Sequence, residues 1–312
     1  MRNTCLNTIF EISKNNDKVI FVGSDLGAGV LNDFKRKYPK RFFMEGISEQ
    51  YITSMCAGLA MEGLIPYFNT IGTFLTRRNF EQNIVDIGLH NLPVRLIGNG
   101  GGLAYASLGP THQAIEDIAI MRTIPNMHIL SPCDANEMKE LMLKTPKIKN
   151  PIYIRLSRGG DRIVTNNKKI QYGKSIIFGD PKDVLFITTG ITTQEAIEAS
   201  KILSKKGIKA GVLHNHSLKP FDKKKLLSII NKQRLIISVE EHIVYGGLGS
   251  IILETINELK ISKQIKLEML GIKNKFIKKY GSQQELFKYC KIDSKNLVNF
   301  VNKKYGKRKK NF

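Results

Sequence analysis

The stretch DVLFITTGITTQEAIEASKILSKKGIKAGVLHNH (183–216) decides the fold class of this chain. Residues 183–190 and 208–216 are mostly apolar, as in buried strands. The segment between them, 191–207, has the amphipathic spacing of a helix that ends at Gly207. A strand, a helix and a strand in this order predict one βαβ unit of a parallel sheet whose helices cover its faces.

The same alternation extends along the chain in both directions. Strand-like apolar runs are found at 18–25, 65–70, 94–100, 127–132, 151–157 and 234–242. Helix-like segments are found at 48–63, 80–91, 134–145, 222–232 and after 246–250. We therefore predict an α/β protein with two consecutive α/β domains and mainly parallel sheets.

A polar, glycine-containing stretch at 159–183 interrupts this alternation. It predicts a first domain at 1–165, a linker with one or two short strands at 166–182, a second domain at 183–305 and a basic tail at 306–312. The length of 312 residues agrees with two domains of ordinary size.

The net charge of +22 raises the question of nucleic-acid binding. Residues 1–158 contain 18 basic and 14 acidic residues, and residues 159–312 contain 31 and 13, so the excess lies in the second half. Most of these basic residues are lysines, and the sequence has no Trp. Base readout favours arginine, and stacking on bases favours aromatic side chains. We therefore expect no specific nucleic-acid partner.

No apolar run approaches the roughly 20 residues that a membrane helix needs. The N-terminal residues also lack the apolar core of a signal peptide. The four cysteines are widely spaced and form neither a CxxC pair nor a cluster with histidines. We expect a reduced, cytoplasmic protein with no membrane association and no metal ligands of its own.

Several features could carry chemistry, and each also has a structural interpretation. The glycines at 98–102 follow a strand but match no phosphate-binding motif, so a flexible or close-packed loop is the favoured interpretation. Glu49 begins a predicted helix, where the helix dipole alone favours a carboxylate. His112 follows a turn, and a single histidine is more often structural. Arg155 and Arg158 end a strand, where open α/β sheets bind ligands, with a surface arginine as an equal alternative.

Taken in order, six segments resemble the C-terminal half of transketolase, which comprises a pyrimidine-binding domain and a transketolase C-terminal domain. They are Ser24-Asp25-Leu26, GISEQ (46–50), GTFLTRRNF (72–80), GPTHQAIED (109–117), LSRGG (156–160) and VEEHIVYGGLGS (239–250). The Gly-Pro-Thr-His-Gln motif is the most specific of them. The Glu-Gln pair of GISEQ is closer to deoxyxylulose-phosphate synthase. The resemblance covers nearly the whole chain.

The resemblance also implies a partner. In this superfamily, thiamine diphosphate and its Mg²⁺ are held by a Gly-Asp-Gly motif with a downstream Asn, in a separate diphosphate-binding domain. Here Gly-Asp occurs only at Gly160-Asp161-Arg162 and Gly179-Asp180-Pro181, and neither matches. The implied enzyme is therefore split. An N-terminal subunit would carry the diphosphate-binding domain and hold Mg²⁺, and the active site would form at the subunit interface of an α2β2 assembly.

By the same resemblance, Glu49 is the glutamate that hydrogen-bonds the aminopyrimidine nitrogen N1′ and activates the cofactor. Phe74 and Phe80 match aromatic residues that surround this ring. Arg77 stands where transketolases have another aromatic residue, so the aromatic set is only partly reproduced. Asp25 is a weaker candidate contact to the cofactor.

The resemblance assigns substrate roles to three further residues. His112 would contact substrate oxygens and assist proton transfer, Arg158 would pair with a substrate phosphate, and Arg2 lies near the family's other phosphate-binding arginine. Leu108 and Gly100 replace an Asp and a His that help transketolases to read the sugar. These departures predict a modified or nucleotide-linked sugar rather than the ordinary pentose phosphates.

The implied function is transfer of a two-carbon ketol unit from a ketose or ketose phosphate to an aldose acceptor. One alternative is an enzyme like deoxyxylulose-phosphate synthase, or like the β subunit of a 2-oxo acid dehydrogenase, that uses pyruvate or another 2-oxo acid. The other alternative is a catalytically silent scaffold subunit.

Overall fold

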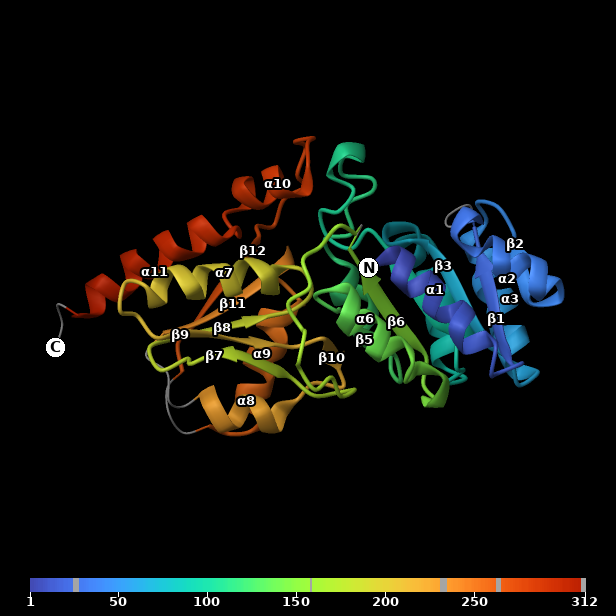
Figure 1. Ribbon diagram of the computed structural model, residues 1–312, viewed down its shortest axis with the longest axis horizontal. Helices are drawn as coiled ribbons and strands as arrows, with labels where there is room; N and C mark the ends of the chain where they lie inside the picture. Colours follow the sequence, from blue (N-terminus) through green and yellow to red (C-terminus); the bar gives the residue numbers. More distant parts are fainter. Residues whose placement is uncertain (25–27, 158, 231–234, 262–264, 310–312) are drawn as a thin grey trace.

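The computed structural model describes residues 1–24, 28–157, 159–230, 235–261 and 265–309. It contains two β-sheets, each covered by helices on both faces (Figure 1). This architecture confirms the predicted pair of α/β domains with mainly parallel sheets. Among the described helices, none is both long enough and apolar enough to cross a membrane.

The first sheet has seven strands in the order β10-β5-β6-β4-β3-β1-β2. They are β1 (Val19–Gly23), β2 (Phe42–Met44), β3 (Ile65–Ile71), β4 (Arg95–Asn99), β5 (His128–Leu130), β6 (Ile152–Leu156) and β10 (Ser217–Lys219). All are parallel except β10, which pairs antiparallel with β5. Because β10 follows the strands of the second domain in sequence, the chain crosses back to complete the first sheet.

The second sheet has five strands in the order β12-β11-β8-β9-β7. They are β7 (Ile176–Gly179), β8 (Val184–Thr188), β9 (Ala210–His214), β11 (Leu235–Ile243) and β12 (Leu267–Ile272). The predicted βαβ unit is formed by β8, α7 (Thr192–Ser204) and β9, whose strands are parallel neighbours. The edge strand β7 lies within the predicted linker and runs antiparallel to β9.

Helices cover both faces of the first sheet because its strands are apolar on both sides. Along β1, Val19 and Phe21 belong to the core cluster that includes residues of α1 and α6, whereas Ile20 and Val22 belong to the cluster with residues of α3 and α5. The helices of this domain are α1 (Arg2–Ser13), α2 (Asn32–Lys37), α3 (Glu49–Met61), α4 (Phe80–Gln82), α5 (Asp117–Arg122) and α6 (Ala135–Met142). The helix predicted at 80–91 is divided into α4 and the π-helical turn η4 (Asn83–Gly88).

The second sheet is covered in the same way. The remaining helices are α8 (Lys223–Ile230), α9 (Leu248–Glu258), α10 (Gln283–Cys290) and α11 (Ser294–Lys309). Helix α11 packs against α7 and extends into the predicted basic tail. In Figure 1 the N-terminus lies near the junction of the two domains, and the C-terminus lies at the far end of the second domain.

Candidate active site

Glu49 is a buried carboxylate at the first position of α3. Its side chain is only 1% exposed. Oε2 accepts a hydrogen bond from Nη1 of Arg78 at 2.5 Å, and Oε1 accepts one from Oγ1 of Thr70 at 3.4 Å. The N-cap residue of α3, Ser48, makes no side-chain capping bond, so the positive end of the helix dipole also favours the carboxylate. Glu49 is thus a fixed negative group with one mobile partner, because the side chain of Arg78 is 41% exposed.

Phe74 and His112 lie next to this pair. Phe74 begins the π-helical turn η3 (Phe74–Arg78), and Cζ of Arg78 lies 4.6 Å from the centroid of its ring. The Phe74 and His112 rings meet edge to face with their centroids 5.2 Å apart. The contacts therefore run from Glu49 through Arg78 and Phe74 to His112. Phe80 is half-buried and packs against the hydrophobic core of the first domain.

Arg77 holds the loop that carries His112. Its guanidinium donates to the carbonyl oxygens of Gln113 at 2.9 Å and Pro110 at 3.5 Å, and it forms an ion pair with Glu116. These anchors lie on both sides of His112, whose Nδ1 is 2.8 Å from Oγ1 of Thr111. An arginine at this position therefore does not stack on a ring but fixes the loop.

The glycine-rich segment 98–102 is a close-packed loop, as its lack of a phosphate-binding pattern predicts. A Cβ on Gly101 would meet the side chain of Arg155 at 2.5 Å, and one on Gly102 would meet that of Glu241 at 2.4 Å. Gly102 also has a φ of +64°, which disfavours other residues. Oε1 of Glu241 accepts the amide proton of Leu103 at 2.7 Å, so this loop docks on the second domain.

Arg155 is a buried structural residue. Its Nε donates to Asp117 at 2.7 Å and its Nη2 donates to the carbonyl of Glu241 at 2.8 Å. Burial disfavours its charged form, but Asp117 and Glu241 outweigh burial and raise the pKa of Arg155. Burial also raises the pKa of Glu241 to about 7, which the charge of Arg155 opposes. Arg155 therefore joins the domains and does not face solvent as an anion site.

Asp25 and Arg158 lie outside the described residues. Arg2 begins α1, and its Nε is buried without a hydrogen-bond partner among the described atoms. The preceding N-terminal ammonium lies 4.0 Å from Oδ2 of Asp161. The start of α1 is therefore adjacent to the segment that follows β6, where LSRGG lies.

A second buried polar cluster joins the domains away from Glu49. Glu137 of α6 accepts hydrogen bonds from Nε2 of His214 and from the amide of Cys133, each at 2.8 Å, and Nδ1 of His216 lies 2.8 Å from its other oxygen. Candidate ligand atoms of Cys133, Glu137 and His214 lie within 4.8 Å of one another. The oxygen and the nitrogen of this set already bond each other, and Nδ1 of His214 bonds Thr193. The cluster is therefore a hydrogen-bonded junction.

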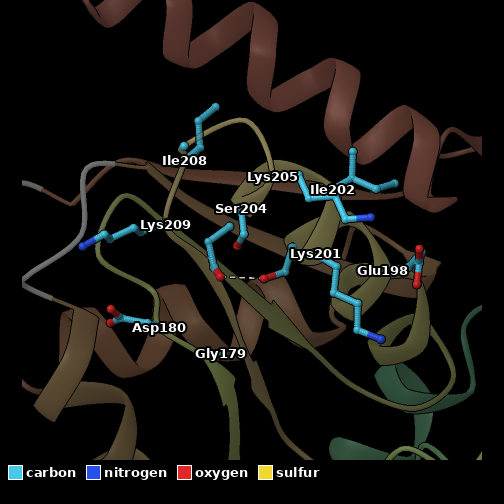
Figure 2. A pocket seen from close by; sticks show the side chains of 12 residues that line it. Gly179, Asp180, Glu198, Lys201, Ile202, Ser204, Lys205, Ile208 and Lys209 are labelled. Carbon is cyan, nitrogen blue, oxygen red and sulfur yellow. Dashed lines mark hydrogen bonds between the residues drawn. The ribbon is translucent and has the colours of Figure 1, made fainter.

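Two surface hollows lie outside this chain of contacts. One, of about 710 Å³, lies in the second domain (Figure 2), where Lys201, Lys205 and Lys209 line it and Oγ of Ser200 bonds the carbonyl of Ala210. The other, of about 310 Å³, lies between the domains. Its lining includes Glu116, the partner of Arg77, so it adjoins the loop of His112.

Sequence reasoning missed Arg78. The resemblance brings Glu49, Phe74 and His112 to one site, and the structure places them within one chain of contacts. The two successive arginines in GTFLTRRNF were the available signal, because charged residues are unexpected within a motif that supplies an aromatic pocket. The pattern does not reveal that one arginine faces Glu49 and the other faces Glu116.

Comparison with known proteins identifies the family. The model of the transketolase pyrimidine-binding domain matches residues 1–161, and that of the transketolase C-terminal domain matches residues 173–297. One of the two subunits of an apulose-4-phosphate transketolase from Phocaeicola vulgatus is 32% identical over 309 residues, which are 97% of each protein.

Another relative is about twice as long. The 1-deoxy-D-xylulose-5-phosphate synthase of Caldanaerobacter subterraneus subsp. tengcongensis is 33% identical over 302 residues, which are 96% of this chain and 48% of the synthase. The chain thus spans about half the length of that synthase. A solved structure described as a split gene transketolase, inactive beta4 tetramer, is 32% identical with a TM-score of 0.87, and the match covers 97% of both chains. The chain belongs to the thiamine diphosphate-dependent transketolase family, of which it contains the pyrimidine-binding and C-terminal domains.

Proposed function

We propose that this chain is the C-terminal subunit of a split transketolase. With its partner it would transfer a two-carbon ketol unit from a ketose or ketose phosphate to an aldose acceptor. The observation that carries this proposal is the continuous contact from the buried Glu49 through Arg78 and Phe74 to His112. The match to the apulose-4-phosphate transketolase subunit over 97% of both proteins supports it.

The residues around Glu49 fit the aminopyrimidine of thiamine diphosphate. The flat guanidinium of Arg78 already lies on the Phe74 ring and donates a hydrogen bond to Glu49, so a planar group with a nitrogen donor fits there. When bound, thiamine diphosphate supplies the carbanion chemistry. Glu49 would share a proton with N1′ of the ring, Phe74 and Phe80 would flank the ring, and Asp25 would add a contact.

His112 and two arginines would bind the substrate. His112 is held at the edge of Phe74 by a loop anchored on Arg77, so it can contact substrate oxygens and take part in proton transfer. Arg158 and Arg2 would bind the substrate phosphate, which the proximity of the α1 start to the LSRGG segment supports. The side chain of Leu108, at a transketolase Asp position, favours a different sugar from the ordinary pentose phosphates.

A partner subunit would complete the site and hold Mg²⁺ and the diphosphate, most simply in an α2β2 assembly. Two observations support it: the chain lacks the Gly-Asp-Gly motif, and the apolar residues Ile47 and Tyr51 beside Glu49 are 68% and 60% exposed. To test this, the tagged chain is recovered from its native cells with any stoichiometric partner. We expect a partner with Gly-Asp-Gly and a downstream Asn, and cofactor bound only in the complex. No partner and no cofactor under any condition would favour the silent scaffold.

The runner-up is a synthase that uses pyruvate or another 2-oxo acid. The 33% identity to a 1-deoxy-D-xylulose-5-phosphate synthase and the Glu-Gln pair at Glu49 and Gln50 favour it. Donor choice separates the two functions. Pyruvate consumption with release of CO₂ would establish the synthase, whereas cleavage of a ketose would establish the transketolase.

A further inference from the structure

Arg78 makes the two contacts that the aminopyrimidine ring would make. Its guanidinium lies over the face of Phe74, with Cζ 4.6 Å from the ring centroid, and its Nη1 donates to Oε2 of Glu49 at 2.5 Å. A guanidinium is planar, stacks on aromatic rings and donates hydrogen bonds in its own plane. It therefore imitates a flat heteroaromatic ring that carries a protonated nitrogen.

We propose that Arg78 is an internal placeholder in the aminopyrimidine subsite, and that it must leave Glu49 before thiamine diphosphate can bind there. This inference rests on the proposed function. It adds a competition between a side chain of this subunit and the cofactor for the same carboxylate oxygen and the same ring face.

The burial of the two partners determines which one moves. Glu49 is 1% exposed, starts a 13-residue helix and is contacted by Thr70, so its carboxylate is fixed. The side chain of Arg78 is 41% exposed and ends the short turn η3. A partly exposed arginine can rotate into water at little cost, whereas an unpaired buried carboxylate is strongly disfavoured. Arg78 thus protects Glu49 until another donor replaces it.

The neighbouring arginine shows that this arrangement is specific. Arg77 is held by Glu116 and by the carbonyls of Pro110 and Gln113, and it faces the loop of His112. The described contacts of Arg78 are Glu49 and Phe74. Of this pair, Arg77 therefore has a fixed structural role, and Arg78 can exchange its partners.

The placeholder lowers the apparent affinity for the cofactor. If the subsite is available only for a fraction of the time, the apparent dissociation constant rises by the reciprocal of that fraction, so about one tenth availability gives about tenfold weaker binding. Removing the guanidinium should therefore tighten cofactor binding, although it deletes a positive charge beside an anionic ligand. A residue that merely helps to hold the cofactor would have the opposite effect.

The test measures the dissociation constant of thiamine diphosphate at fixed Mg²⁺ by isothermal titration calorimetry, on the complex of the chain with its partner. Arg78→Gln should bind the cofactor about tenfold more tightly than the unchanged protein. Arg78→Lys, which keeps the charge without the planar group, should also bind more tightly. Arg36→Gln is the matched control, because Arg36 is 81% exposed and pairs with Asp33 elsewhere in the first domain. Its affinity should not change.

Equal or weaker binding by both Arg78 variants would overturn the placeholder while leaving the proposed function intact. Failure of all variants and of the unchanged complex to bind the cofactor would overturn both. Binding by the Arg78 variants alone would support both. A crystal structure of the complex with cofactor provides an independent check: Arg78 should have left Glu49, and a retained contact between them beside the bound ring would contradict the proposal.

Discussion

The carboxylate of Glu137, in the first domain, accepts a hydrogen bond from Nε2 of His214, in the second domain, at 2.8 Å. Both side chains are fully buried. Burial raises the pKa of Glu137, but the charges and hydrogen bonds of His214 and His216 outweigh it and hold this pKa well below its usual range. The junction of the domains therefore depends on a buried ionic contact.

Glu137→Ala should lower the free energy of unfolding by about 3–5 kcal/mol, because it leaves two buried histidines without their carboxylate. Glu140→Ala, in the same helix, is the control, since Glu140 is a half-exposed partner of Lys144 and should matter by less than about 1 kcal/mol. Urea denaturation measures both variants. Equal stabilities would show that Glu137 does not hold the junction.

The stability of the chain should depend on the ionisation of Glu240. Burial raises the pKa of Glu240 from 4.5 to about 7. A raised folded pKa means that its contribution to stability is fully present below pH 4.5 and is lost as the pH rises through 7. The maximum size of this contribution is about 3 kcal/mol.

Glu240→Gln removes the ionisation. The free energy of unfolding of the unchanged protein should therefore fall relative to that of Glu240→Gln between about pH 4.5 and about pH 8. The constant loss of one hydrogen bond to Leu248 or Gly249 does not alter this slope. Chemical denaturation at a series of pH values measures the difference, and two parallel curves would refute the prediction.

Glu49→Gln should abolish turnover by the complex, by about 10²-fold or more, because glutamine cannot share a proton with the cofactor ring. The fold should remain intact, since an amide can still contact Arg78 and Thr70. A steady-state assay measures turnover, and circular dichroism tests the fold. A variant that kept most of its activity would exclude the proposed role of Glu49.

Arg77→Gln should release the loop that carries His112. Amide hydrogen exchange of residues 110–116 should accelerate, because the anchors to Pro110, Gln113 and Glu116 are lost together. The exposed Arg36→Gln should leave this exchange unchanged. In the complex, kcat/KM should fall as His112 becomes less well positioned. Unaltered exchange would mean that the loop is held by other contacts.

Gly102→Ala should destabilise the chain by about 2–4 kcal/mol, because its φ is +64° and its Cβ would lie 2.4 Å from the Glu241 side chain. Gly46→Ala is a matched control. Its φ is +72°, but nothing lies within 4 Å of the added Cβ, so only the backbone cost of about 1 kcal/mol applies. Thermal or urea unfolding compares the two variants. Similar losses would indicate that the loop can move away from Glu241.

Much of the fold follows from local patterns in the sequence. Apolar runs and amphipathic segments predict the βαβ unit at 183–216, because strand and helix periodicity reflects burial on one or both faces. Asp134 is predicted as a helix N-cap, and its side chain accepts the amide proton of Glu137. The resemblance to transketolase is confirmed over both domains, and it already singles out Glu49, Phe74 and His112.

The sequence alone thus determined the fold class, the family and the segments that meet at the candidate site, because each is written in short, contiguous patterns. Only the tertiary structure decided the partners of the charged side chains. It set Arg155 between Asp117 and Glu241, sent β10 back to the first sheet, and placed Arg78 on Glu49. The physical reason is distance along the chain: a charged group pairs with whatever burial brings near it, and those neighbours are tens of residues away in sequence.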